Sequence, residues 1–253
     1  MLRVLDLFAG LGGFSLGLER TGGFSTVAFC EIEKFPRKVL AKHWPEVPCY
    51  EDVTKLTGDI LKRDGIAVDV ITGGFPCQDI STAGRQAGLG EGTRSGLWSE
   101  IVRLIGDVSP RYVIVENVTN LLSGPSEQRG GWFGRVLGDL AECGYDAEWA
   151  VVPASYVGAW HRRGRIWLVA YPDNQRCKGR TAQPMEWQRQ ITRQSMRGFE
   201  GWPGRPNLPA PRLCNSNDGI SGRMDRLKAL GSAVVPQIPE MIGRAILEAE
   251  AAI

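Results

Sequence analysis

Short apolar runs alternate with helical apolar spacing along most of this chain. The runs are a few residues long and are bounded by glycine, proline or polar residues, which is typical of strands in a sheet. We predict strands at 1–7, 26–30, 68–72, 111–115, 148–152 and 165–170, with an extended stretch at 49–50. One-sided apolar spacing predicts helices that begin near Phe14 and that cover 97–105, 132–140 and 238–249. Strands that alternate with helices favour an α/β fold.

One predicted strand ends in a sharp turn that carries a cysteine. The run 68–72 leads into Gly-Gly-Phe-Pro-Cys at 73–77. A free cysteine is most often a small buried hydrophobe. Cys77, however, follows a proline in a glycine turn at the carboxyl end of a strand, where open α/β sheets bind their ligands. We therefore interpret Cys77 as a candidate nucleophile.

The first strand runs into a glycine-rich loop. The sequence Phe-Ala-Gly-Leu-Gly-Gly at 8–13 precedes a helix, and strand, glycine loop and helix form the first unit of nucleotide-binding α/β folds. Glu31 and Asp52 follow the next two extended runs, where a carboxylate can accept hydrogen bonds from a ribose or an adenine amino group. The alternative is that both are solvated surface carboxylates.

Two further polar clusters are predicted at the same sheet edge. Glu116 and Asn117 follow the strand 111–115, and the basic cluster 161–165 opens the last strand. Residues 83–96 are rich in Gly, Arg and Ser with few apolar anchors, so we expect a mobile loop beside the site.

The segment after residue 170 differs from the rest of the chain in its apolar spacing and in its charge. Prolines interrupt any regular spacing there, which predicts a segment dominated by loops. The whole chain has a net charge of +2, but 171–230 carries 11 Lys or Arg against 5 Asp or Glu, whereas the remainder carries 19 against 23. A basic segment in an acidic frame indicates a local contact with a polyanion. The alternative is a solvated basic face.

Composition argues against several classes of protein. The six cysteines form no Cys-x-x-Cys pair, so we expect a reducing cytoplasm and no disulfide framework. The two histidines, His43 and His161, lie in no metal-ligand pattern, and no apolar run approaches the ~20 residues that span a bilayer. We therefore expect neither a metal site nor a membrane segment.

Taken together, these stretches resemble the cytosine-C5 DNA methyltransferases. Five short motifs occur in the family's order over most of the chain. They are Asp6–Gly13 (cofactor loop), Gly74–Gln78 (nucleophile loop), Glu116–Val118 (glutamate motif), Arg163–Arg165 (paired arginines) and Gly231–Pro236 (closing cofactor motif).

The resemblance implies a mechanism and assigns roles. Cys77 would add to C6 of a cytosine flipped out of duplex DNA, and a protonated Glu116 would hydrogen-bond the ring N3. Arg163 and Arg165 would orient the base carbonyl and a neighbouring phosphate. The methyl donor would be S-adenosylmethionine, with Phe8 against the adenine, Glu31 on the ribose, Asp52 on the adenine amine and Leu97 lining the pocket. The full set of implied cofactor residues is Phe8, Ala9, Gly10, Leu11, Gly13, Glu31, Ile32, Asp52, Val53, Pro76, Leu97, Ser232 and Val234.

The resemblance also implies an architecture. We expect a mixed, Rossmann-like methyltransferase sheet flanked by helices in a catalytic domain at 1–170. A small irregular target-recognition segment at 171–222 would follow, and 223–253 would return a motif and a helix to the first domain. The partners would be double-stranded DNA and, as in restriction-modification systems, a cognate restriction endonuclease. We expect a monomer in the cytoplasm of a bacterium or of a phage-infected cell.

Three departures and two rival functions remain. The recognition segment is short for the family, which favours a compact target site. His161 stands where the family usually has glutamine, and Ser232 replaces the usual asparagine of the closing motif. One rival is RNA cytosine methylation on the same fold, but the Cys-Phe-Thr signature of one RNA-directed branch is absent after Glu116. A DNA-binding relative without catalytic activity would be expected to lack Cys77 or Glu116, and both are present.

Overall fold

A seven-stranded sheet organises the described part of the chain. The computed structural model describes residues 1–75, 97–123, 131–159, 161–173 and 229–251. The strand order is β3-β2-β1-β4-β5-β7-β6. The strands are β1 (Leu2–Leu7), β2 (Phe24–Cys30), β3 (Cys49–Tyr50), β4 (Val70–Gly73), β5 (Tyr112–Val118), β6 (Tyr145–Pro153) and β7 (Gly164–Pro172).

The sheet is mixed, as expected for the methyltransferase fold. β3, β2, β1, β4 and β5 are parallel, whereas β7 pairs antiparallel with both β5 and β6. After β1 the chain builds β2 and β3 on one side and then crosses to β4 on the other. β1 and β4 are thus adjacent strands at the point where the strand order reverses, a topological switch point where sheets of this class bind ligands.

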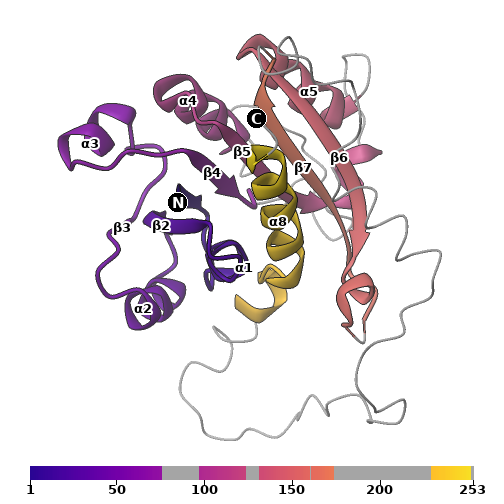
Figure 1. Cartoon of the computed structure of the whole chain (residues 1–253), viewed down its shortest axis with the longest axis horizontal. Coiled ribbons are helices and arrows are strands. Elements are labelled where there is room, and N and C mark those ends of the chain that lie inside the picture. Colours follow the sequence, from indigo (N-terminus) through magenta and orange to yellow (C-terminus); the bar gives the residue numbers. More distant parts are fainter. Residues whose placement is uncertain (76–96, 124–130, 160, 174–228, 252–253) are drawn as a thin grey trace, which may run out of the picture.

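Helices cover both faces of the sheet (Figure 1). They are α1 (Gly13–Glu19), α2 (Lys34–His43), α3 (Gly58–Arg63), α4 (Trp98–Val108), α5 (Gly131–Glu142) and α8 (Gln237–Ala251). Helices α1 and α8 lie side by side on one face, and α4 and α5 pack on the other. The chain therefore forms three layers, as both faces of a largely parallel sheet must be covered.

The alternation of side chains along each strand divides the core into these two sides. In β4, Val70 contacts the cluster that contains α1 and α8, whereas Ile71 contacts the cluster that contains α4 and α5. Period-two alternation sends neighbouring strand residues to opposite faces. The apolar spacing predicted for 97–105 becomes the buried face of α4, through Ile101, Leu104 and Ile105.

Several elements differ in extent from the sequence-based prediction. β5 continues through Glu116 to Val118, because the antiparallel β7 supplies a partner as far as the pair Val118 and Arg165. β7 likewise continues to Pro172. The predicted mobile loop at 83–96 and, apart from residues 171–173, the predicted recognition segment at 171–222 lie outside the described residues.

Candidate active site

The loop after β1 is fastened by a buried glutamate at the end of β2. Glu31 is 7% exposed, and its carboxylate accepts hydrogen bonds from the backbone N–H groups of Gly10 (2.8 Å) and Glu33 (2.7 Å). Each carboxylate oxygen can accept more than one hydrogen bond, so acceptor capacity remains for a ligand hydroxyl. Glu31 is therefore not the solvated surface carboxylate of the alternative interpretation.

The backbone of the same loop adopts an unusual conformation. Phe8 has a φ of +52°, and Gly10 and Gly12 also have positive φ values. A left-handed conformation is costly for an aromatic residue and persists only where the surrounding structure enforces it, often at ligand sites. A Cβ atom at Gly12 would lie 2.7 Å from the Trp44 ring, so the glycine permits the close approach of α2.

A buried aspartate lies beneath this loop. Asp6 is fully buried in β1 and accepts hydrogen bonds from Ser15 Oγ in α1 (2.8 Å) and Thr72 Oγ1 in β4 (2.7 Å). Burial raises its pKa to about 7, although the two hydroxyl groups oppose that rise. One carboxyl group thus joins the two strands and the helix that meet at the switch point, a role we did not predict.

The residues predicted to surround the adenine follow β1, β2 and β3, or precede α4. Phe8, Val53 and Leu97 pack on the core cluster of the α4 and α5 side. Ile32, in contrast, is 65% exposed although it is hydrophobic. Asp52 is partly exposed and accepts hydrogen bonds from Thr54 N (3.0 Å) and Thr54 Oγ1 (2.7 Å), which lower its pKa.

The closing motif lies directly against the glycine loop. A Cβ atom at Gly13 would be 2.7 Å from the Val234 carbonyl oxygen, so this glycine is required for the contact between the two segments. Ser232 is exposed, and its hydroxyl donates to the Ala229 carbonyl (3.2 Å). The structure thus brings together motifs that are more than two hundred residues apart.

Of the remaining predicted cofactor residues, Ala9 is 7% exposed and donates its N–H to the Cys30 carbonyl (3.2 Å). Leu11 is partly buried in the same loop.

Arg163 connects the paired arginines to the closing motif. Its guanidinium donates hydrogen bonds to the carbonyl oxygens of Gly231 (2.5 Å) and Ala233 (3.1 Å). Arg163 also has a φ of +27°, one of three positive values at non-glycine residues among those described. Burial lowers its pKa, and the nearby Arg165 acts in the same direction. In this structure Arg163 thus orders the segment that packs on the glycine loop.

The buried Glu116 of β5 forms an ion pair with the partly buried Arg165 of β7. Arg165 Nε lies 3.0 Å from Glu116 Oε1, and Glu116 is 8% exposed. Burial raises the pKa of Glu116, while the positive charges of Arg165 and Arg163 oppose the rise. A carboxyl group in this environment retains its proton at a higher pH than an exposed glutamate and can donate it.

The start of the nucleophile loop lies against the glutamate motif. A Cβ atom at Gly74 would be 3.4 Å from Glu116 Oε2, and Asn117 Nδ2 donates to the Phe75 carbonyl (3.4 Å). Pro76 and Cys77 lie outside the described residues. The chain therefore leaves β4 beside Glu116, three residues before the predicted nucleophile.

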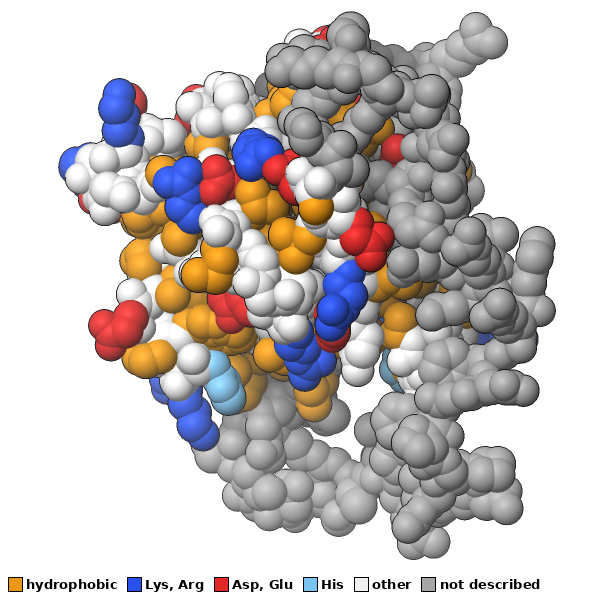
Figure 2. All heavy atoms as spheres, in the orientation of Figure 1, with side chains coloured by type: hydrophobic (Ala, Val, Ile, Leu, Met, Phe, Trp, Pro, Cys, Tyr) orange, Lys and Arg blue, Asp and Glu red, His pale blue; other side chains and the backbone are white. Residues whose placement is uncertain are grey.

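The described surface carries no single-sign patch on the face shown in Figure 2. Basic and acidic side chains are interspersed there with hydrophobic ones. Most of the basic segment 171–230 lies outside the described residues. Among the residues described, no group of three or more His, Cys, Asp or Glu side chains is arranged to hold a metal ion. No described helix combines the length and apolar character that crossing a membrane requires.

Known proteins share both this sequence pattern and this fold. A family model described as C-5 cytosine-specific DNA methylase matches residues 2–200. The type II methyltransferase M.Sau3AI of Staphylococcus aureus is 36% identical over 184 residues, which are 67% of this chain and 43% of that protein. M.CviJI of Paramecium bursaria Chlorella virus IL3A is 37% identical over 169 residues, 66% of this chain and 42% of that protein. The chain thus spans less than half the length of these relatives.

Solved structures agree with this relationship. A prophage-encoded E. coli protein, described as a candidate DNA modification methyltransferase, has a TM-score of 0.57 and 28% identity, covering 70% of this chain and 48% of that one. S. pombe Dnmt2 methyltransferase has a TM-score of 0.59 over 81% of this chain and 57% of that one, but at 18% identity it supports only the fold. The motif order, the mixed sheet and the match over most of its length together show that this chain belongs to the C-5 cytosine-specific DNA methylase family.

Proposed function

We propose that the chain transfers a methyl group from S-adenosylmethionine to C5 of a cytosine that is flipped out of duplex DNA. The observation that carries this proposal is the cluster around Glu116. A buried carboxyl group with a raised pKa pairs with Arg165 and lies against Gly74, where the loop to Cys77 begins. Relatives named type II methyltransferases support the same reaction class.

The residues around the glycine loop fit an adenosine-containing cofactor. Glu31 would accept from the ribose hydroxyls while it holds Gly10, and Ile32 would lose its exposure to the adenine ring. Asp52 would accept from the adenine amine, and the Gly13 contact with Val234 would close the pocket beside the methionine portion. When bound, S-adenosylmethionine supplies an electrophilic methyl group.

The protein's own residues activate the base. The Cys77 thiolate forms a bond to C6, and the ring electrons move toward N3, which takes a proton from Glu116. C5 becomes enamine-like and nucleophilic. After C5 is methylated, the C5 proton leaves to solvent, the sulfur–C6 bond breaks and the N3 proton returns to Glu116, which restores the aromatic ring, the free thiolate and the protonated carboxyl group. Arg165 holds Glu116 throughout and orients the base carbonyl.

The partners follow from the same reaction. The basic segment within 171–222 would contact DNA phosphates and read bases in the major groove. The names of the relatives favour membership in a restriction-modification system, in which a cognate endonuclease cuts the unmethylated site.

Labelled S-adenosylmethionine tests the proposal. The wild-type chain is expected to label duplex DNA but not an RNA duplex of matched sequence, and Cys77→Ser is expected to abolish labelling. A duplex with 5-fluorocytosine at the target position should trap a covalent complex, because fluorine cannot leave as a proton does. Labelling of RNA alone, or transfer by Cys77→Ser comparable with the wild type, would overturn the proposal.

A further inference from the structure

The turn that carries Asp52 and Val53 has little support from the sheet. β3 contains only Cys49 and Tyr50 and pairs with β2 through two residue pairs at the edge of the sheet. Among the described residues, the Asp52 carboxylate bonds locally, to Thr54 and Lys55. An edge turn of this kind needs a tertiary contact to keep one conformation.

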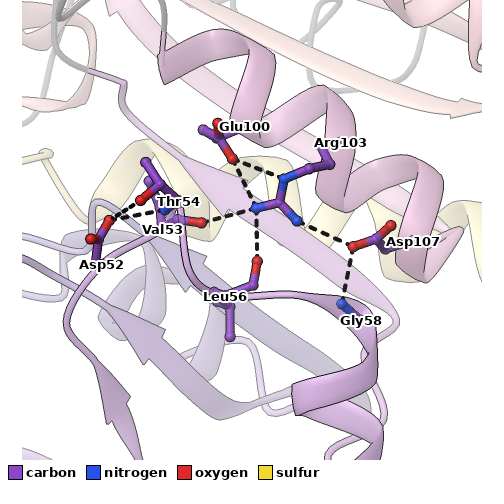
Figure 3. A network of polar contacts seen from close by, with 8 residues as sticks. All are labelled: Asp52, Val53, Thr54, Leu56, Gly58, Glu100, Arg103 and Asp107. Carbon is purple, nitrogen blue, oxygen red and sulfur yellow. Dashed lines mark hydrogen bonds and ion pairs between the residues drawn. The ribbon is translucent and has the colours of Figure 1, made fainter.

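Arg103 of α4 supplies such a contact. Its Nη2 atom donates to two backbone carbonyls of the turn, those of Val53 (3.0 Å) and Leu56 (2.7 Å). Figure 3 shows the guanidinium inserted between the helix and the turn. Because the two acceptors are main-chain atoms on both sides of one turn, their joint binding fixes the backbone and not merely a side chain.

Two carboxylates of α4 hold the Arg103 guanidinium in place. Glu100 accepts from Nε (2.9 Å), and Asp107 accepts from Nη1 (3.2 Å). Asp107 also accepts a hydrogen bond from the N–H of Gly58 (3.0 Å), at the beginning of α3. The network around Arg103 therefore extends past the turn to α3 (Figure 3). A planar guanidinium with five donors can satisfy carboxylates and carbonyls at once, which an ammonium group cannot do.

The helix that carries Arg103 is packed on the sheet through its buried face. Ile101, Leu104 and Ile105 of α4 are buried in the core cluster that also contains Val53 and Leu56. The contacts of Arg103 therefore connect the edge turn to a helix that is anchored in the core.

We propose that Arg103 is a positioning residue that sets the place of the Asp52–Val53 turn and thereby the affinity and selectivity for the adenine end of the cofactor. This inference rests on the proposed function, since it takes the ligand of the turn to be an adenosine group. Arg103 touches neither the cofactor nor the reacting atoms. Its effect is to hold the acceptor where the adenine amine arrives.

The test measures binding without methyl transfer. S-adenosylhomocysteine and its deaminated analogue, S-inosylhomocysteine, are titrated into wild type and Arg103→Lys by calorimetry. We expect Arg103→Lys to weaken S-adenosylhomocysteine binding by roughly 5- to 50-fold, as expected for losing one or two charge-assisted hydrogen bonds. The analogue that lacks the amine should be weakened much less, so that the preference for adenine falls.

Two further variants keep the test decisive. Glu100→Gln removes a charge that orients the guanidinium and should shift affinity and preference in the same direction by a smaller factor. Arg111→Ala breaks an ion pair with Glu250 away from the turn and should leave both unchanged. The kcat at saturating cofactor should stay within about threefold of wild type in Arg103→Lys, because the cluster around Glu116 is untouched.

The outcomes separate this inference from the proposed function. If the wild type fails to bind S-adenosylhomocysteine, the proposed function is wrong. If the wild type binds it but Arg103→Lys binds both ligands as tightly, or loses both by the same factor, Arg103 does not position the adenine acceptor.

Discussion

Arg165 Nε lies 3.0 Å from Glu116 Oε1, so the carboxyl group predicted to carry a proton is paired with a permanent cation. The two effects on its pKa oppose each other: burial raises it, and the arginine limits the rise. Together, burial and the arginine give a carboxyl group that is held in place and keeps its proton at a higher pH than an exposed glutamate does.

Replacement of Glu116 tests this proton donor. Glu116→Gln keeps the size of the side chain but cannot protonate N3, so methyl transfer should fall by roughly 10²- to 10⁴-fold. Binding of S-adenosylhomocysteine should stay unchanged. Glu148→Gln alters a carboxylate on β6 that accepts from Tyr171 and serves as the matched control. A Glu116→Gln variant with wild-type kcat would remove Glu116 from the mechanism.

The pH dependence of methyl transfer should change when the positive charge of Arg165 is removed. In the proposed mechanism the protonated Glu116 is the active form, so activity should be lost as pH rises through its pKa. Removal of the cation in Arg165→Ala raises that pKa further, and the alkaline limb of the kcat profile should move to higher pH while the maximal rate falls. Arg165→Lys retains the charge and should leave the limb near its wild-type position. A limb that moves to lower pH in Arg165→Ala would contradict the assignment.

Asp6 makes a separate contribution to the pH dependence of stability. Its pKa rises from the ordinary 3.8 to about 7 on folding, so its contribution is fully present below pH 3.8 and is lost as pH rises through about 7. One pKa unit corresponds to about 1.4 kcal/mol, so the effect amounts to a few kcal/mol.

Urea unfolding of wild type and Asp6→Asn at pH 5 and pH 8 measures this contribution. The free energy of unfolding of the wild type, relative to the variant, should be larger at pH 5 than at pH 8. Taking the difference removes contributions of other groups such as Asp69, whose pKa is lowered. An identical difference at both pH values would show that Asp6 does not titrate in this range.

The packing of α1 against α8 can be tested at Gly17. A Cβ atom at Gly17 in α1 would lie 2.2 Å from the Pro236 carbonyl oxygen and 3.0 Å from Glu240 N. Gly17→Ala should therefore lower the free energy of unfolding by about 2–4 kcal/mol. Gly138 in α5 has no atom within 4 Å of such a position, so Gly138→Ala should raise it by up to about 1 kcal/mol. Thermal unfolding of both variants provides the measurement, and equal effects would argue against close α1–α8 packing.

Local apolar pattern was enough to predict most of the sheet, but not its ends. We placed Glu116 after a strand that ended at Val115, and it lies inside β5 because a strand from far downstream pairs with it. Helices α2 and α3 were not predicted. Pro36 lies in the first turn of α2, where proline is tolerated. The six-residue α3 depends on its Thr57 cap and on its contact with α4.

The candidate site was predictable where its residues form short motifs and not where they act through the backbone. Glu31, Glu116 and Arg165 were recognised because each belongs to a compact local pattern. Arg103 was missed because its acceptors are carbonyl groups, which leave no trace in residue type, and its spacing to Glu100 and Asp107 resembles a surface ion pair. Asp6 had a usable signal, since an acidic residue within an apolar strand is seldom buried without a reason.

The side-by-side packing of α1 and α8 has a consequence for biosynthesis. Phe14 and Leu18 of α1 share one buried cluster with Ile238 and Ile242 of α8. At about 5–20 residues per second, a ribosome needs roughly 10–40 s to reach α8 after it has made α1. During that interval the apolar side of the first helix lacks the contacts that α8 makes with it. The contact between the glycine loop and the closing motif would then form only after the ribosome has made the closing motif.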